Sequence, residues 1–129
     1  MTDWAWIVDR ETRAIHGRLL ALHGGAPGVR DAGLLASALA RPLQLQAYGE
    51  ANDMIDLAAA YTFGIVRNHP FVDGNKRVGF IVGVLFLEFN GAHFTASEAD
   101  ATQAVLDLAI GALDELGYAA FLRENVVYA

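Results

Sequence analysis

The sequence contains no cysteine, only one lysine and no long uninterrupted apolar run. Without cysteine, disulfide bonds and thiolate chemistry are excluded, which is typical of a cytoplasmic protein. The longest apolar run, Val78–Leu87, has ten residues, whereas a membrane-spanning helix needs about 20. No N-terminal segment combines a basic start with a long apolar stretch, so we expect neither a secretory signal nor a membrane location.

Positive charge is also scarce. The 129 residues include 9 Lys and Arg against 15 Asp and Glu, which gives a net charge of −6 and a pI near 5.0. Direct binding to nucleic acid usually requires a basic face, so we do not expect DNA as a partner. Hydrophobic residues make up 54% of the chain and the mean hydropathy is +0.30, which favours a compact core and an apolar face for a protein partner.

Apolar residues at helical spacing, separated by turn signals, predict six helices without an interdomain linker. The predicted fold class is therefore all-α, with one compact helical bundle and a single domain over residues 1–129. The predicted helices are Asp9–His23, Asp31–Arg41, Asn52 or Asp53 to the turn at His69, Lys76–Phe89, Ser97–Gly111 and Asp114–Asn125.

The connections between these helices are predicted from their breakers. Pro42 is expected to end the second helix, which leaves Leu43–Asn52 as a less regular segment, partly extended or flap-like. A short extended piece is expected at His93–Phe94. The predicted N-caps are Asp9, Asp31 and Ser97, the last forming a capping box with Asp100. Gly79 and Gly83 lie one turn apart, so a neighbouring helix is expected to approach closely along that stripe.

The candidate chemistry lies where the third predicted helix ends and the fourth begins, in residues 69–77, HPFVDGNKR. Pro70 disfavours helix at His69. Asp73-Gly74 is a turn signal, and the glycine tolerates a positive φ. The result is a loop whose N–H groups open onto a helix N-terminus, which is a natural anion site.

Two cations follow directly in the first turn of that helix. Lys76 and Arg77 stand where positive charge usually opposes the helix dipole. This position is understandable if an anion such as a phosphate is bound there. The only lysine of the chain, beside eight arginines, is Lys76, and a flexible point charge suits a single phosphate group.

Three side chains near the loop have both a functional and a structural interpretation. His69 can act as a general base near neutral pH, or it can be an ordinary capping or core histidine. Asp73 can bind Mg²⁺ beside a phosphate, or it can simply be a turn residue. Arg67 can reach a phosphate, or it can stabilise a helix C-terminus.

The remaining histidines, His16, His23 and His93, lack metal-ligand spacing. We therefore do not expect a zinc site. The first two are interpreted as helix-surface or partly packed residues.

Residues 69–77 resemble the signature of the Fic/Doc family, which is roughly HPFx(D/E)GN(G/K)R. Residues 24–42, GGAPGVRDAGLLASALARP, are similar to the corresponding region of the Doc (death-on-curing) branch. Together with the helical spacing, the resemblance covers nearly the whole chain. It implies a small helical bundle with the catalytic loop at the N-terminus of a buried central helix, in agreement with the fold predicted above.

The resemblance also implies a role for each residue of the loop. His69 would be the general base that takes the proton from a target hydroxyl. Phe71 would anchor the loop in the core, and Asp73 would hold Mg²⁺. The expected phosphate-binding residues are Gly74, Asn75, Lys76 and Arg77, the first two through an anion hole formed with the following backbone.

Two positions depart from the commonest Fic pattern, because Lys76 replaces a glycine and Phe80 replaces an arginine. Typical Fic enzymes transfer AMP from ATP to a protein hydroxyl, and Lys76 would put a bulky cation where the phosphates lie in that mode. Doc-type members share the lysine. The resemblance implies that they bind ATP the other way round and transfer its γ-phosphate to a serine or threonine of a translation factor such as elongation factor Tu.

The resemblance further implies a growth-arresting toxin that a separate, Phd-like antitoxin holds inactive. Fic proteins often carry an inhibitory segment of their own, (S/T)xxxE(G/N). The nearest string here, Ala120–Asn125, begins with alanine, so inhibition in trans is expected. AMP transfer and a non-catalytic partner-binding module are the two alternative functions.

Overall fold

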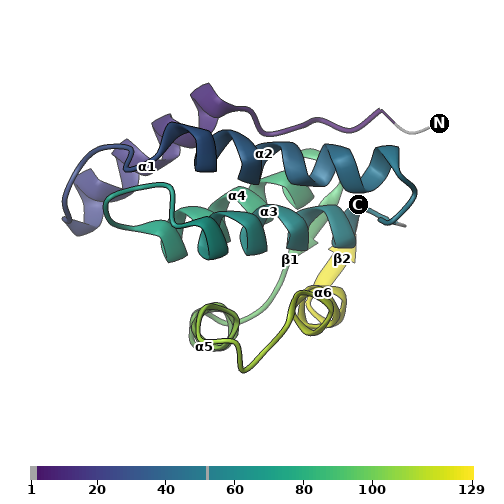
Figure 1. The fold of residues 1–129 in the computed structure, drawn as a ribbon. Coiled ribbons are helices and arrows are strands. Elements are labelled where there is room, and N and C mark those ends of the chain that lie inside the picture. Colours follow the sequence, from purple (N-terminus) through teal and green to yellow (C-terminus); the bar gives the residue numbers. More distant parts are fainter. Residues whose placement is uncertain (1–2, 52) are drawn as a thin grey trace.

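The computed structural model describes residues 3–51 and 53–129, and these residues form six helices and one two-stranded sheet (Figure 1). The elements are α1 (Asp9–His23), α2 (Ala32–Ala47), α3 (Met54–Asn68), α4 (Asn75–Phe89), β1 (Ala92–Phe94), α5 (Glu98–Ala109), α6 (Glu115–Glu124) and β2 (Val126–Tyr128). The predicted all-α bundle is confirmed, with the sheet as a minor addition. No helix in the described part is both long and apolar enough to cross a membrane.

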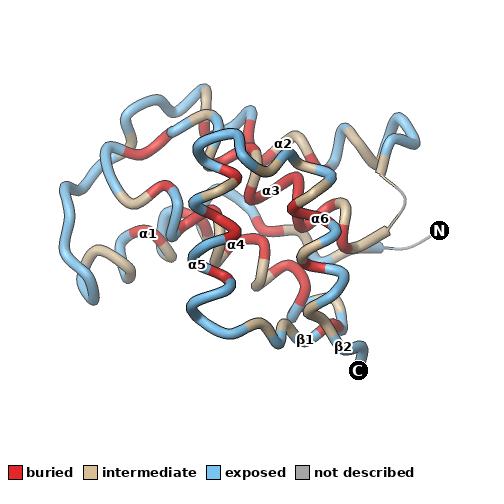
Figure 2. The backbone as a smooth tube through the Cα atoms, turned by 90° about the horizontal axis from the view of Figure 1, so that it is seen from below, coloured by how far each residue is buried: buried red, intermediate tan, exposed pale blue. Residues whose placement is uncertain are grey.

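Helices α3 and α4 form the centre of the bundle. In Figure 1, α1 and α2 lie on one side of this pair, whereas α5 and α6 lie on the other side and run across it. The buried positions follow the faces that these elements turn toward one another (Figure 2). Helix α3 is buried almost continuously from Leu57 to Tyr61, as expected for a helix with neighbours on several sides.

The predicted helix starts are mostly confirmed by side-chain caps. The Asp31 carboxylate accepts the Leu34 N–H at 2.9 Å, and the Ser97 hydroxyl accepts the Asp100 N–H at 3.1 Å. The same arrangement begins α3 and α6, with Asp53 and Asp114 as the caps. Asn52, the alternative start of the third helix, lies outside the described residues.

The predicted cap of the first helix is wrong by one residue. Val8 is the N-cap of α1, and Asp9 is already helical and pairs with Arg13. The Glu11 carboxylate accepts the Val8 N–H at 3.1 Å. A glutamate three residues after the N-cap therefore accepts the N–H of the N-cap residue itself, whereas Asp9 as a cap would have accepted an N–H further along the helix.

The predicted end of the second helix at Arg41 is also wrong, because α2 continues through Pro42 to Ala47. A proline inside a helix costs about 3 kcal/mol, but Pro42 is buried and α2 packs extensively against α3. The Ala38 carbonyl, which Pro42 leaves without its helical donor, lies against Gly64, where an added Cβ would stand 3.3 Å from that oxygen. Tertiary packing thus outweighs the local breaker, and the first half of the expected irregular segment, up to Ala47, is helical.

The extended piece predicted at His93–Phe94 is confirmed as part of β1. It pairs antiparallel with β2, with His93 opposite Val127. The sequence did not predict β2, since three residues are too few for a periodic pattern. The sheet brings Phe94 against Phe80, with ring centroids 5.7 Å apart.

The predicted close approach at Gly79 and Gly83 is confirmed between α3 and α4. A Cβ on Gly79 would stand 3.2 Å from the Thr62 carbonyl oxygen, and one on Gly83 would stand 3.1 Å from the Ala58 carbonyl oxygen and collide with Thr62 Oγ1. Thr62 is not free to move away, because its hydroxyl donates to the Gly79 carbonyl at 2.7 Å. Small residues on α4 therefore set the distance between the two central helices.

Substituting Gly83→Ala is expected to lower the free energy of unfolding by about 1–3 kcal/mol, because the added methyl overpacks this contact. Gly17→Ala is the matched control, since it lies on exposed α1 with nothing within 4 Å of the added Cβ. The control is expected to raise stability by about 0.5–1 kcal/mol through its helix propensity. Urea unfolding of both variants measures the difference, and equal effects would contradict the close approach.

Candidate functional site

The loop of residues 69–74 connects α3 to α4 and is bound on its outer side by the α1–α2 linker. Val29 and Phe71 form an antiparallel bridge. The Val72 N–H donates to the Gly28 carbonyl at 3.0 Å, and the Arg30 N–H donates to the Pro70 carbonyl at 2.7 Å. A segment some 40 residues away in sequence thus fixes the path of the loop.

His69 is the C-cap of α3 and adopts the left-handed conformation, with φ 54° and ψ 53°. It is the one non-glycine with positive φ among the residues that the structure describes. The Arg30 guanidinium holds this conformation, because Nε donates to the His69 carbonyl at 2.8 Å and Nη2 to the Asn68 carbonyl at 3.0 Å. The His69 side chain is exposed and lines the cavity described below.

Asn75 was expected to bind phosphate as part of the anion hole, and the structure adds a second role, because its side chain bonds to the backbone of the loop. Its side chain is buried, with Oδ1 accepting the Phe71 N–H and Nδ2 donating to the Phe71 carbonyl, both at 2.9 Å. Phe71 itself is fully buried beneath the loop. With Oδ1 and one Nδ2 hydrogen engaged by Phe71, the Asn75 side chain stabilises the loop, and its backbone N–H lies at the uncapped start of α4.

The start of α4 differs from four of the other helix starts. Its N-cap is Gly74, with φ 82°, and no side chain caps it, whereas α2, α3, α5 and α6 each have an Asp or Ser cap. The first N–H groups of a helix have no carbonyl partner within it. The N–H groups of Asn75, Lys76 and Arg77 are therefore available to an anion.

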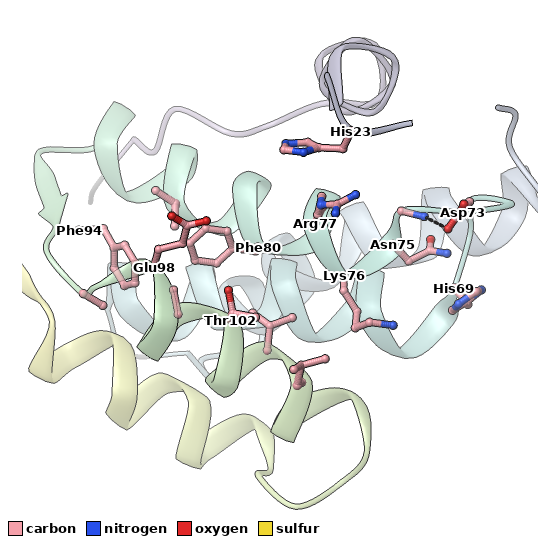
Figure 3. A pocket seen from close by; sticks show the side chains of 16 residues that line it. His23, His69, Asp73, Asn75, Lys76, Arg77, Phe80, Phe94, Glu98 and Thr102 are labelled. Atoms are coloured by element: carbon pink, nitrogen blue, oxygen red, sulfur yellow. Dashed lines mark hydrogen bonds between the residues drawn. The ribbon is translucent and has the colours of Figure 1, made fainter. Parts of the chain in front are cut away.

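Lys76 and Arg77 add positive charge at this helix start. Both side chains are exposed, and within the described residues neither forms an ion pair. Since both also line the cavity (Figure 3), their charge is directed to whatever the cavity binds.

The cavity has a volume of about 850 Å³ and lies between α4, α5 and the loop. Its polar end contains His69, Asp73, Lys76 and Arg77, and its apolar end contains Phe80 and Phe94 beside Glu98 and Thr102 (Figure 3). A cavity of this size is in the range that holds a drug-sized ligand. One charged end and one aromatic end suit a ligand that has a polyphosphate and an apolar ring.

Asp73 is compatible with binding Mg²⁺. Its carboxylate is exposed at the cavity, with Oδ1 accepting the Gly74 N–H at 2.8 Å and Oδ2 accepting the Ala26 N–H at 3.3 Å. Each oxygen keeps a further lone pair for a metal ion. The described residues contain no group of three or more His, Cys, Asp or Glu that could enclose a metal. Mg²⁺ would therefore need phosphate oxygens as its other ligands, which is its usual mode beside a nucleotide.

Arg67 does not line this cavity. Its guanidinium lies over the Phe63 ring, 6.0 Å from the centroid, and the Arg41 guanidinium lies 5.1 Å from the same ring. The expected phosphate contact from Arg67 is thus not supported by the geometry, because α3 directs this side chain toward Phe63.

Two histidines have places that the sequence-based interpretation missed. His23 lines the cavity. His16, expected at the helix surface or partly packed, is only 5% exposed and contacts the back of the loop. Its position in the first helix gave no signal for this contact, just as the sequence gave none for Arg30.

The chain matches the model of the Fic/DOC family over residues 6–87. It is 33% identical over 106 residues to Protein kinase doc of Escherichia phage P1, covering 82% of this chain and 80% of that protein. It is 42% identical over 98 residues to Toxin Doc of Mycolicibacterium smegmatis, covering 74% of this chain and 71% of that protein.

Proposed function

The chain belongs to the Fic/DOC family, in its Doc branch, and from this premise we propose that it is a Doc-like toxin that transfers the γ-phosphate of ATP to a serine or threonine hydroxyl of a translation factor. One observation carries the proposal. A single cavity contains an exposed histidine, an uncapped helix start and two cations, Lys76 and Arg77, that form no ion pair within the described part of the chain.

In the proposed reaction, ATP places its phosphates at the start of α4. His69 takes the proton of the target hydroxyl, and the hydroxyl oxygen attacks the γ-phosphorus in line with the leaving group. The bond from the γ-phosphorus to the β,γ-bridging oxygen breaks, and ADP leaves with that oxygen. The α4 N–H groups, Lys76 and Arg77 stabilise the charge on the transferred group.

Asp73 is the proposed Mg²⁺ ligand. When bound, Mg²⁺ would supply positive charge that offsets the negative charge of the phosphates. Other residues of the chain position the loop and shape the cavity around the ligand. Arg30 and the α1–α2 linker fix the loop, and the aromatic end of the cavity excludes water from one side of the ligand.

AMP transfer is the alternative reaction, and the nature of the transferred group separates the two. Incubation of the protein with elongation factor Tu, Mg²⁺ and ATP labelled at either the α- or the γ-phosphate is expected to leave only the γ label on the factor. Intact-mass measurement of the factor is expected to show a gain of one phosphate. Retention of the α label, with a gain of one AMP, would replace the kinase proposal by nucleotidyl transfer.

We further propose that a Phd-like antitoxin inhibits this protein in trans, in the cytoplasm, where translation factors act. Ala120–Asn125, the nearest string to an internal inhibitory segment, begins with alanine. It lies at the end of α6, and none of its residues is among the described residues that line the cavity. Both observations support inhibition by a segment from another chain.

A further inference from the structure

Most carbonyl groups of residues 68–73 accept a hydrogen bond, and of the donor residues only Asn75 is among the described residues that line the cavity. Hydrogen bonds hold the carbonyls of Asn68, His69, Pro70, Phe71 and Asp73. The carbonyl is the negative end of the peptide dipole, so a carbonyl held by one of these donors is restrained from rotating its negative partial charge toward a bound anion. The donors are backbone N–H groups of the linker and the side chains of Arg30, Asn75 and His16.

His16 holds the last carbonyl before the helix starts. It projects from α1, is 5% exposed, and its Nε2 lies 2.9 Å from the Asp73 carbonyl oxygen. Because a carbonyl can only accept, Nε2 carries the proton in this bond. The imidazole also stacks on the Phe71 ring, with centroids 4.0 Å apart and planes inclined by 16°. Both contacts fix the ring directly behind Gly74.

The bonded carbonyl belongs to the Asp73–Gly74 peptide, whose orientation has two consequences. Its oxygen faces His16, and its N–H donates to Asp73 Oδ1 at 2.8 Å. Gly74, at φ 82° and ψ 15°, has no Cβ to oppose a rotation of this peptide. Rotation would move the oxygen next to the Asp73 carboxylate and the cavity, which adds negative partial charge where the anion is to bind.

We propose that His16 is a positioning residue of the site, whose Nε2–H keeps the Asp73–Gly74 peptide in the orientation that turns its carbonyl toward His16 and leaves the N–H groups at the start of α4 to the bound phosphate. The inference rests on the proposed function for the identity of the anion, since it is the polyphosphate of ATP that would occupy this place. His16 itself touches neither the nucleotide nor the target hydroxyl and acts through the peptide that it holds.

If His16 only fills space, variants of similar volume should bind the anion equally well, whereas a donor role requires a hydrogen-bond donor at this position. Glutamine and methionine have similar length and volume, and both remove the stacking on Phe71. Only glutamine can donate a hydrogen bond to the Asp73 carbonyl. The pair His16→Gln and His16→Met therefore isolates the donor. If His16→Met does not fold, His16→Phe takes its place, because it keeps a ring beside Phe71 and lacks the donor.

The test uses inorganic pyrophosphate as the anion and measures its affinity by titration calorimetry, together with the Gly74 amide resonance of the ligand-free protein in ¹H–¹⁵N spectra. His16→Gln is expected to stay within about threefold of the wild-type affinity and to keep the Gly74 resonance. His16→Met is expected to bind about tenfold more weakly, as the loss of one well-placed donor implies, with a shifted Gly74 resonance.

Equal affinities and an unchanged Gly74 resonance in both folded variants would overturn the inference, and so would a wild-type protein that does not bind pyrophosphate. A wild-type protein that binds pyrophosphate but transfers nothing from ATP would instead remove only the proposed function. The two failures are distinguishable, because neither pyrophosphate affinity nor the Gly74 resonance requires transfer.

Discussion

Substituting His69→Asn is expected to slow phosphoryl transfer by about 10²- to 10⁴-fold, the range that a general base usually contributes. Asparagine tolerates the left-handed conformation that this position requires, and the His69 side chain is exposed. The substitution should therefore remove the base without disturbing the fold. The rate of γ-label transfer to elongation factor Tu, measured on protein of confirmed thermal stability, gives the effect.

His93→Asn is the control for this experiment. His93 is exposed on β1, pairs with Glu88 at 2.9 Å and does not line the cavity, so transfer should stay within about twofold of wild type. In cells, His69→Asn is expected to abolish growth arrest. If growth arrest persisted without any transfer activity, the non-catalytic binding module would become the better account of the protein.

Substituting Lys76→Gln or Arg77→Gln is expected to lower transfer by about 10²- to 10³-fold, as for other groups that stabilise transition-state charge. The free energy of unfolding, in contrast, should rise. Each substitution removes a cation from the positive end of α4, which is expected to raise the free energy of unfolding by about 0.3–1 kcal/mol at low ionic strength. Steady-state transfer rates and urea unfolding of the same preparations test both signs.

Arg10→Gln provides a matched control, because Arg10 is an exposed cation in the first turn of α1 and does not line the cavity. It should show a similar small gain in stability with no loss of transfer. If Lys76→Gln and Arg77→Gln behaved like Arg10→Gln in the transfer assay, the phosphates would not lie at the start of α4. Loss of both activity and stability would instead assign the two cations a structural role.

The sequence by itself determined the features that depend on neighbours along the chain. Asp31 and Ser97 were predictable as N-caps because a cap bonds to an N–H only three residues ahead. The turn after His69 was predictable because Pro70 restricts the backbone of the residue before it and Gly74 tolerates a positive φ. The place of the candidate site at the start of α4, with its two cations, was visible for the same reason.

The tertiary structure decided what depends on contacts between distant segments. Arg30 holds a carbonyl 39 residues away and His16 holds one 57 residues away, and no local pattern encodes either partner. Helix α2, which packs against α3, continues through Pro42, and Arg67 lies over the Phe63 ring and does not line the cavity. Local propensities amount to a few kcal/mol at most, so the burial of a helix face overrides them wherever the two disagree.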